Sequence, residues 1–207
     1  IYLQAEYLRK LLSDIAKIQE LDNKAKTKSP MKRHTLMQFL NQQGAALPLW
    51  VNGVNGFPPP SVGAIELLES APLKQGDAVA ALVEDNWILA EIQAALPGGK
   101  FDVKDVDDEQ KTRMVLPRKC LIPLPKYRAD PTRDAHALFP KDAVVLALYP
   151  QTTCFYRGIV QKAPETASDQ YTITFDDSSY TSGYSPPLPI HQRYVVSYRD
   201  APDARDR

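Results

Sequence analysis

The sequence has little of the features that would define a function class at once. Only two of its 207 residues are cysteine, Cys120 and Cys154, which is too few for a disulfide framework and gives no metal-ligand spacing with the three histidines. No apolar run approaches the length of a membrane span, and the residues given show no signal-peptide pattern. These absences predict an intracellular protein that needs no membrane, no metal and no other cofactor.

An excess of charge of one sign is also missing. Lys plus Arg and Asp plus Glu number 25 each, so the formal net charge is zero. Proteins that bind nucleic acid gain much of their affinity from basic side chains that neutralise phosphates, and no basic field exists here. We therefore expect no direct contact with nucleic acid.

The N-terminal part of the chain has a helical pattern. Apolar residues recur every seven positions at Ile1, Leu8 and Ile15, which predicts an amphipathic helix over residues 2–25 that needs a partner surface. The chain begins inside this pattern without an initiator Met, so we expect it to be part of a longer protein. A second helix is expected from Pro30 to Gly44, with an apolar face of Met31, Leu36, Phe39 and Leu40.

The rest of the chain contains an internal repeat. Gly76-Asp77-Ala78-Val79 is echoed by Lys141-Asp142-Ala143-Val144, and the two aspartates are 142 − 77 = 65 positions apart. A unit of this length holds the four or five short strands of an SH3-like barrel. The sequence therefore predicts a mainly β protein with two tandem SH3-like barrels packed together, preceded by an N-terminal α-helical segment.

The expected layout has six parts. They are a helical segment at 1–45, a Pro/Gly-rich linker at 46–72, a first barrel at 73–125, a connector at 126–140, a second barrel at 141–200 and a tail at 201–207. Within the connector, we expect Tyr127, Leu138 and Phe139 to join a core between the two barrels.

Aromatic residues in the second barrel suggest a binding site. Tyr149 and Tyr156 flank a tight turn, so a hairpin would bring both rings to one end of adjacent strands. Phe175 and Asp177 are two positions apart on the next expected strand, where alternation places them on one face. Three rings with a nearby acid suit a cation without hydrogen-bond donors, such as methylated lysine. The competing interpretation is that the rings are only barrel core.

The first barrel has acids where the second has rings. Ile88 stands in the place of Tyr156, and Asp105 stands in the place of Phe175. Asp105 and Asp107 are expected to share a strand face, within an acidic run that on its own is more often a solvated loop. Two converging carboxylates would accept the three donors of a primary ammonium, such as a free chain terminus.

Three runs carry a resemblance to a known family. LALYPQTTCFY, FDDSSYTSGYSPP and QRYVV resemble the tandem Tudor domains of the histone-reading subunit of the SAGA coactivator complex. The resemblance implies a nuclear chromatin reader, with trimethyl- or dimethyl-lysine at the fourth position of the histone-three tail held by Tyr149, Tyr156, Phe175 and Asp177. It implies that Asp105 and Asp107 hold the amino terminus of that tail. Lys104 departs from the family, which tends to have an acid there.

The same resemblance implies partners and leaves alternatives. The N-terminal helix resembles a coiled coil through which the family docks into a SAGA-type histone acetyltransferase complex. Cys154, His191 and the pair Asp176 and Asp177 could be proposed as a catalytic set. No nucleophile motif surrounds the cysteine, however, so we do not expect an enzyme. A methyl-arginine reader is the closest alternative, and a module that stacks nucleic-acid bases is the other.

Overall fold

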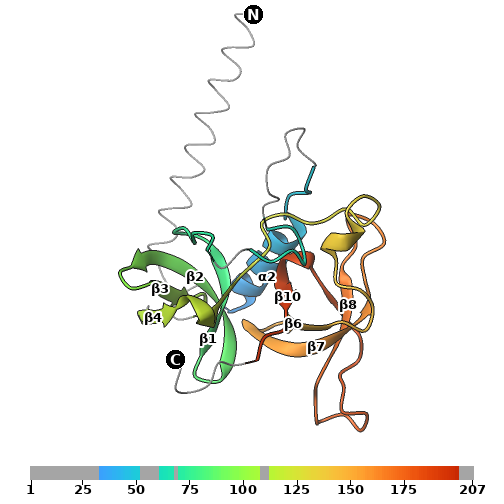
Figure 1. Ribbon diagram of the computed structural model, residues 1–207. Helices are drawn as coiled ribbons and strands as arrows, with labels where there is room; N and C mark the ends of the chain where they lie inside the picture. The colour runs from blue at the N-terminus through green and yellow to red at the C-terminus, as the bar shows by residue number, and fades with distance from the viewer. Residues whose placement is uncertain (1–32, 52–60, 68–69, 108–111, 201–207) are drawn as a thin grey trace, which may run out of the picture. The chain divides into compact units, whose positions relative to one another are not determined.

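The computed structural model describes residues 33–51, 61–67, 70–107 and 112–200, drawn in colour in Figure 1. The expected helix over residues 2–25 and the tail at 201–207 lie outside this range. Within the described residues the chain is mainly β, with a single α-helix, as the sequence predicts. None of the helices in that part of the chain is long and apolar enough to cross a bilayer.

The first five strands form one antiparallel group in the spatial order β5-β1-β2-β3-β4. The 3₁₀ helix η1 (Arg118–Cys120) turns the chain into the last strand. All five strands fall within 73–125, the range expected for the first barrel. They are β1 (Ala78–Val83), β2 (Asn86–Leu96), β3 (Lys100–Asp105), β4 (Met114–Pro117) and β5 (Leu121–Pro123).

The second five strands repeat this arrangement in the order β10-β6-β7-β8-β9. The 3₁₀ helix η3 (Gln192–Tyr194) precedes the last strand just as η1 precedes β5. The repeated order confirms the predicted class of two small tandem barrels. The strands are β6 (Val144–Leu148), β7 (Cys154–Lys162), β8 (Tyr171–Phe175), β9 (Leu188–Ile190) and β10 (Val195–Ser197).

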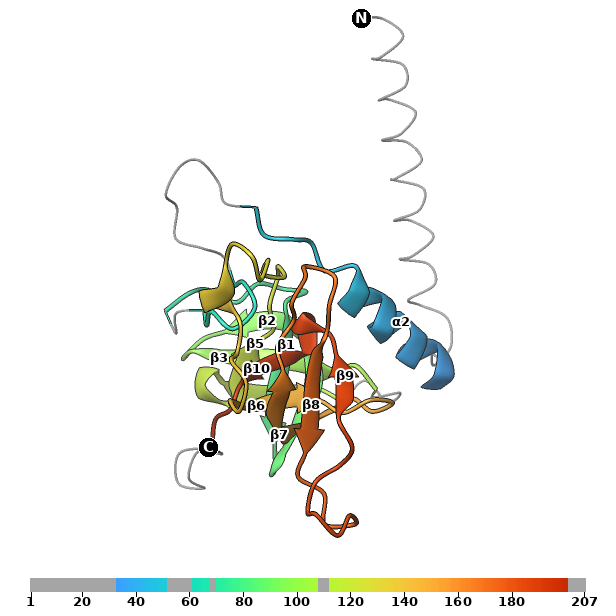
Figure 2. The same ribbon diagram turned by 90° about the vertical axis from the view of Figure 1, so that its right-hand side faces the viewer.

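The two halves are joined by direct strand pairing. In β2 and β7, Trp87 pairs with Phe155 and Ile88 pairs with Cys154, so one continuous sheet runs through both halves (Figures 1 and 2). One buried cluster contains side chains from both sides of this junction. It includes Ala80, Leu82, Leu89 and Ile122 from the first half and Val145, Leu146, Val160 and Ile173 from the second. Shared hydrogen bonds and a shared core make the junction rigid.

The connector packs as expected at two of the three positions that were predicted to join the core between the barrels. Leu138 and Phe139 are partly buried against the shared core, and the Phe139 amide donates to the Tyr171 hydroxyl at 3.0 Å. The expectation was wrong for Tyr127. Its ring instead makes an edge contact with Trp50, with centroids 5.5 Å apart, in a small separate cluster. Tyr127 therefore ties the linker to the connector, because its neighbours on that side come from the linker.

The described parts of the segment 46–72 lie along the connector. Leu49 forms a parallel bridge with Arg128. The buried side chain of Gln192 accepts from the Ala129 amide at 2.8 Å and donates to the Ala129 carbonyl at 3.1 Å. A buried amide that satisfies both backbone groups of one residue holds the connector against the second half.

Helix α2 (Arg33–Ala45) packs on the second half, beside β9 in Figure 2. Its buried face differs from the predicted one: Met37 is buried, whereas Phe39 is 42% exposed. Gly44 does not end the helix but allows a close approach. A Cβ atom there would lie 2.6 Å from the Cδ2 atom of His191, so a larger residue would push the helix away from the barrel.

Candidate functional site

The loop between β6 and β7 brings two tyrosine rings together. The Tyr149 amide donates to the Cys154 carbonyl at 3.0 Å, which extends the strand pairing by one step. The Thr152 hydroxyl donates to the Tyr149 carbonyl at 2.9 Å and accepts from the Cys154 amide at 3.2 Å. The Tyr149 and Tyr156 rings lie with centroids 5.8 Å apart and planes 79° apart. The expected hairpin geometry is therefore present, and a threonine locks the loop.

Phe175 adds the third ring from the end of β8. It pairs with Gly158 of β7, and its centroid is 5.0 Å from that of Tyr149. A Cβ atom on Gly158 would lie 3.4 Å from the Phe175 Cδ1 atom and 2.6 Å from Ile173. Sequence reasoning passed over this glycine, although an isolated glycine inside a strand is a signal of close approach.

The three rings differ greatly in exposure. Tyr156 is 46% exposed, Tyr149 is half-buried and Phe175 is only 1% exposed. Phe175 thus forms the base of the group, and the tyrosines form its open sides. Partial burial raises the pKa of Tyr156, so its phenol stays neutral at physiological pH.

Asp177 does not lie on a strand. The strand itself is shorter than expected, since β8 ends at Phe175, but pairing continues through the bridge of Asp176 with Tyr184, and the shared face of Phe175 and Asp177 stays a prediction. Its amide donates to the Gly183 carbonyl, and its Oδ1 atom accepts from the Ser179 amide at 2.9 Å and hydroxyl at 2.6 Å. These two bonds from Ser179 lower the pKa of Asp177, so the carboxylate stays charged at neutral pH.

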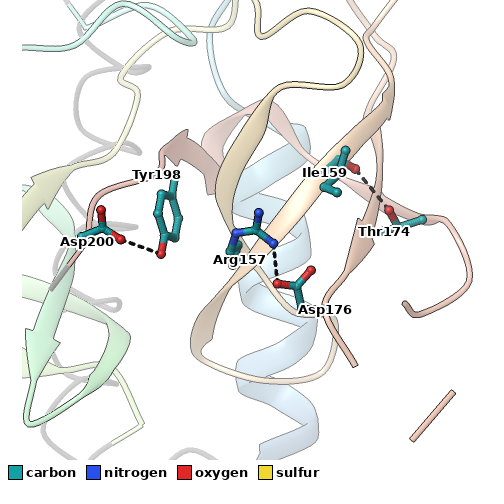
Figure 3. Close-up of polar contacts among 6 residues, drawn as sticks. All are labelled: Arg157, Ile159, Thr174, Asp176, Tyr198 and Asp200. Atoms are coloured by element: carbon teal, nitrogen blue, oxygen red, sulfur yellow. Dashed lines mark hydrogen bonds and ion pairs between the residues drawn. The ribbon is translucent and has the colours of Figure 1, made fainter. Parts of the chain in front are cut away.

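Asp176, next to it, belongs to the opposite face of the sheet. Its carboxylate forms an ion pair with Arg157, drawn in Figure 3, with 2.5 Å between the Oδ2 and Nη1 atoms. The Arg157 guanidinium also lies 5.8 Å from the centroid of the Tyr198 ring. His191 hydrogen-bonds elsewhere, with Asn41 on α2 at 3.0 Å. Asp176 and His191, two of the residues considered for a catalytic set, therefore contact different parts of the protein.

The two acids of the first half lie at the end of β3. The expected shared strand face was wrong, because the strand ends at Asp105 and Asp107 follows in a bend. The Asp107 amide donates to the Asp105 Oδ1 atom at 2.8 Å, which holds the two half-buried residues in one tight turn. Within the described residues, no group of three or more His, Cys, Asp or Glu side chains could hold a metal ion.

The strand register places Asp105 on the same face of the joined sheet as Tyr156. Asp105 pairs with Ala90, and Ile88, two positions along β2, shares the face of Ala90. Ile88 pairs with Cys154, which shares the face of Tyr156. Two strand spacings of about 4.8 Å and four residues of about 3.3 Å separate the Cα atoms of Asp105 and Tyr156 by roughly 16 Å in a flat sheet.

Comparison with known proteins agrees with this architecture. Residues 75–199 match the SGF29 tudor-like domain family. The chain is 46% identical over 205 residues to SAGA-associated factor 29kDa of Drosophila melanogaster, covering 93% of this chain and 71% of that protein. It is 32% identical over 124 residues to SAGA-associated factor 29 homolog B of Arabidopsis thaliana, covering 53% and 44%.

Among solved structures, the crystal structure of Arabidopsis thaliana AGDP1 AGD34 aligns with 61% of this chain and 83% of its own, at 16% identity and a TM-score of 0.37. The repeated five-stranded halves and the match over residues 75–199 define a Tudor-like protein. The chain belongs to the SGF29 Tudor-like family.

Proposed function

We propose that this protein is a chromatin reader that binds the amino-terminal tail of histone three carrying trimethyl- or dimethyl-lysine at its fourth residue. The methyl-lysine enters the ring group of Tyr149, Tyr156 and Phe175 beside Asp177, and the tail's terminal amine binds at Asp105 and Asp107. The observation that carries the proposal is the three-ring contact group on the same sheet face as Asp105, with Asp107 in the turn that follows.

The ring geometry suits a quaternary ammonium. The two nearly perpendicular rings, with centroids 5.8 Å apart, turn their faces in different directions, and an ammonium over an open ring face within about 6 Å of its centroid makes a cation–π contact. Trimethyl-lysine has no N–H to donate, so the ring faces and the charge of Asp177 are the groups that stabilise it.

The spacing suits a short peptide that reaches both places at once. Three extended steps from the first to the fourth residue span about 10 Å, and the lysine side chain adds further reach toward the rings. The separation of roughly 16 Å between the two Cα atoms is compatible with that total. The pairing of β2 with β7 holds this distance constant, so one bound contact promotes the other.

The relatives' names supply the wider role. Both are SAGA-associated factors, and we infer that this protein acts in the nucleus as a subunit of a SAGA-type histone acetyltransferase complex. Its expected N-terminal helix over residues 2–25, outside the described residues, is the part we assign to docking on other subunits. The six-part layout predicted from the sequence, with barrels at 73–125 and 141–200, belongs to the same proposal.

A calorimetric titration tests the function directly. Four peptides share the tail sequence and differ in one group: unmodified lysine, dimethyl-lysine, trimethyl-lysine, or unmodified lysine with dimethyl-arginine. Unmodified lysine keeps its charge but would leave its N–H donors without partners among the rings, at a cost of about 2 kcal/mol or more, which predicts at least a 30-fold weaker affinity for the unmodified peptide. Equal affinity for all four peptides would refute the proposal, and preference for dimethyl-arginine would replace the ligand with the alternative one.

The amine pocket makes a separate prediction. Acetylating the terminal amine of the trimethyl peptide is expected to weaken binding by about 10-fold, because a charge-assisted hydrogen bond contributes about 1.5–3 kcal/mol. Asp105→Asn keeps an oxygen that can accept from the Asp107 amide and removes only the charge. The variant and the acetylation should each weaken binding, and together they should weaken it no further.

A matched control uses Asp142, which has a φ of 67°, a conformation that asparagine tolerates. Asp142→Asn makes the same charge change near the other end of β7, where the Asp142 amide donates to the Val160 carbonyl. It should leave both affinities unchanged. Full additivity of Asp105→Asn and acetylation would place the amine elsewhere.

A further inference from the structure

A cavity of about 370 Å³ lies next to the ring group. Helix α2 forms one side through Gln38 and Asn41, and the loop after β6 forms another through Tyr149 and Gln151. The segment at His191 lines the remaining side. Its volume is within the range of about 300–1,000 Å³ that is usual for ligand sites. Tyr149 borders both the cavity and the ring group, so the two spaces adjoin.

The strand order places this cavity beyond the rings as seen from the acids. Crossing the sheet from Asp105 on β3, one passes β2, β7, β6 and then β10. Helix α2 packs just past that edge, where the Tyr194 hydroxyl donates to the Leu40 carbonyl at 2.8 Å. A peptide that runs from Asp105 to Tyr149 is therefore already directed toward the cavity.

The described lining is polar, with hydrogen-bonding groups that include the two histidines His34 and His191. Among the described residues that line the cavity, none is Lys, Arg, Asp or Glu. Gln38, Asn41 and Gln151 contribute amides. His191 is half-buried, and this burial lowers its pKa, so its ring is neutral at physiological pH. Such a surface suits an uncharged polar chain, because a buried charge would have no partner there.

We propose that this cavity binds the residues that directly follow the methyl-lysine of the bound peptide, as an uncharged polar segment hydrogen-bonded to side-chain amides on α2 and the loop after β6. The inference rests on the proposed function, because the direction of the peptide follows from its amine at Asp105. It assigns α2 a role in recognition, so the reader makes three contacts along one peptide.

Two peptide lengths and a matched pair of variants test this. Both peptides carry the free amine and trimethyl-lysine, and one ends one residue after the lysine whereas the other ends six residues after it, both amidated. Two or three added hydrogen bonds, less the cost of ordering, should make the longer peptide bind about 3- to 10-fold more tightly to the wild-type protein. Gln38→Trp fills the cavity and should reduce that ratio to about one.

Gln42→Trp is the control, because Gln42 is exposed on the same helix and does not line the cavity. It should keep the wild-type ratio. Equal affinity of the two lengths for the wild-type protein, or an unchanged ratio in Gln38→Trp, would overturn the inference. The short peptide keeps this separate from the proposed function, because its preference for trimethyl-lysine over lysine should survive in both variants.

Discussion

Replacing Phe175 with alanine is expected to lower the free energy of unfolding by about 3–5 kcal/mol, whereas replacing Tyr156 with alanine should change it by less than about 1 kcal/mol. Both rings belong to the ring group proposed to bind methyl-lysine, but their burial differs. Phe175 is 1% exposed within the shared core, so its removal leaves a cavity. Tyr156 is 46% exposed, so water fills much of the space that its ring leaves.

The affinity for the peptide is best tested at Tyr156, because its removal should leave the fold nearly intact. Tyr156→Ala is expected to weaken binding of the trimethyl peptide by about 10-fold or more at nearly wild-type stability. It therefore tests the ring group more directly than Phe175→Ala does. Urea unfolding measures the stability, and calorimetry on the folded variants measures the affinity. Tyr180→Ala removes a tyrosine of similar exposure, 43%, and should alter neither quantity. Wild-type affinity in Tyr156→Ala would show that the rings are only barrel core.

The sequence alone predicted correctly those features that are fixed by neighbouring residues or by the internal repeat. The spacing of 65 residues predicted two similar barrels, and the strand order of the second half does repeat that of the first. The closeness of Tyr149 and Tyr156 followed from a short hairpin, because a loop of a few residues fixes which strand ends meet. Neither inference required knowledge of a distant partner.

Predictions failed where a distant contact decides the outcome. The strand expected to run through Asp177 ends at Phe175 in the structure, where Asp176 forms a single bridge with Tyr184 and pairs with Arg157. The sequence pattern cannot show where such long-range contacts end a strand. The acid pair at the end of β3 was misplaced for the same reason, since Asp107 also follows the last paired residue.

The buried face of helix α2 also could not be predicted from the helix sequence alone. Its sequence offered both Met37 and Phe39 for burial, and the choice depends on the surface at His191 and Tyr194, about 150 residues away along the chain. The joint between the barrels was also unforeseen. We expected connector side chains to hold it, whereas β2 and β7 pair directly, which only the folded arrangement reveals.

That direct pairing predicts that binding depends on the spacing between the peptide's terminal amine and its methyl-lysine. A peptide with one extra residue between its terminus and the methyl-lysine should bind about 10-fold more weakly than the natural spacing, because it loses the same charge-assisted amine contact that acetylation removes. The extra residue adds about 3.3 Å, and a rigid joint cannot move the acids away from the rings to match it. The lengthened peptide can therefore bind either at the acids or at the ring group, but not at both together.

Competition against a labelled peptide of natural spacing measures this loss. The control peptide carries the same extra residue just after the methyl-lysine, which leaves the distance from amine to ammonium unchanged, and it should bind within a few-fold of the natural peptide. In Asp105→Asn the two inserted peptides should become nearly equal, because the contact that fixes the spacing has already lost its charge. If the lengthened peptide binds the wild-type protein as tightly as the control, the acids and the rings are not occupied together, and the first barrel serves only to support the second.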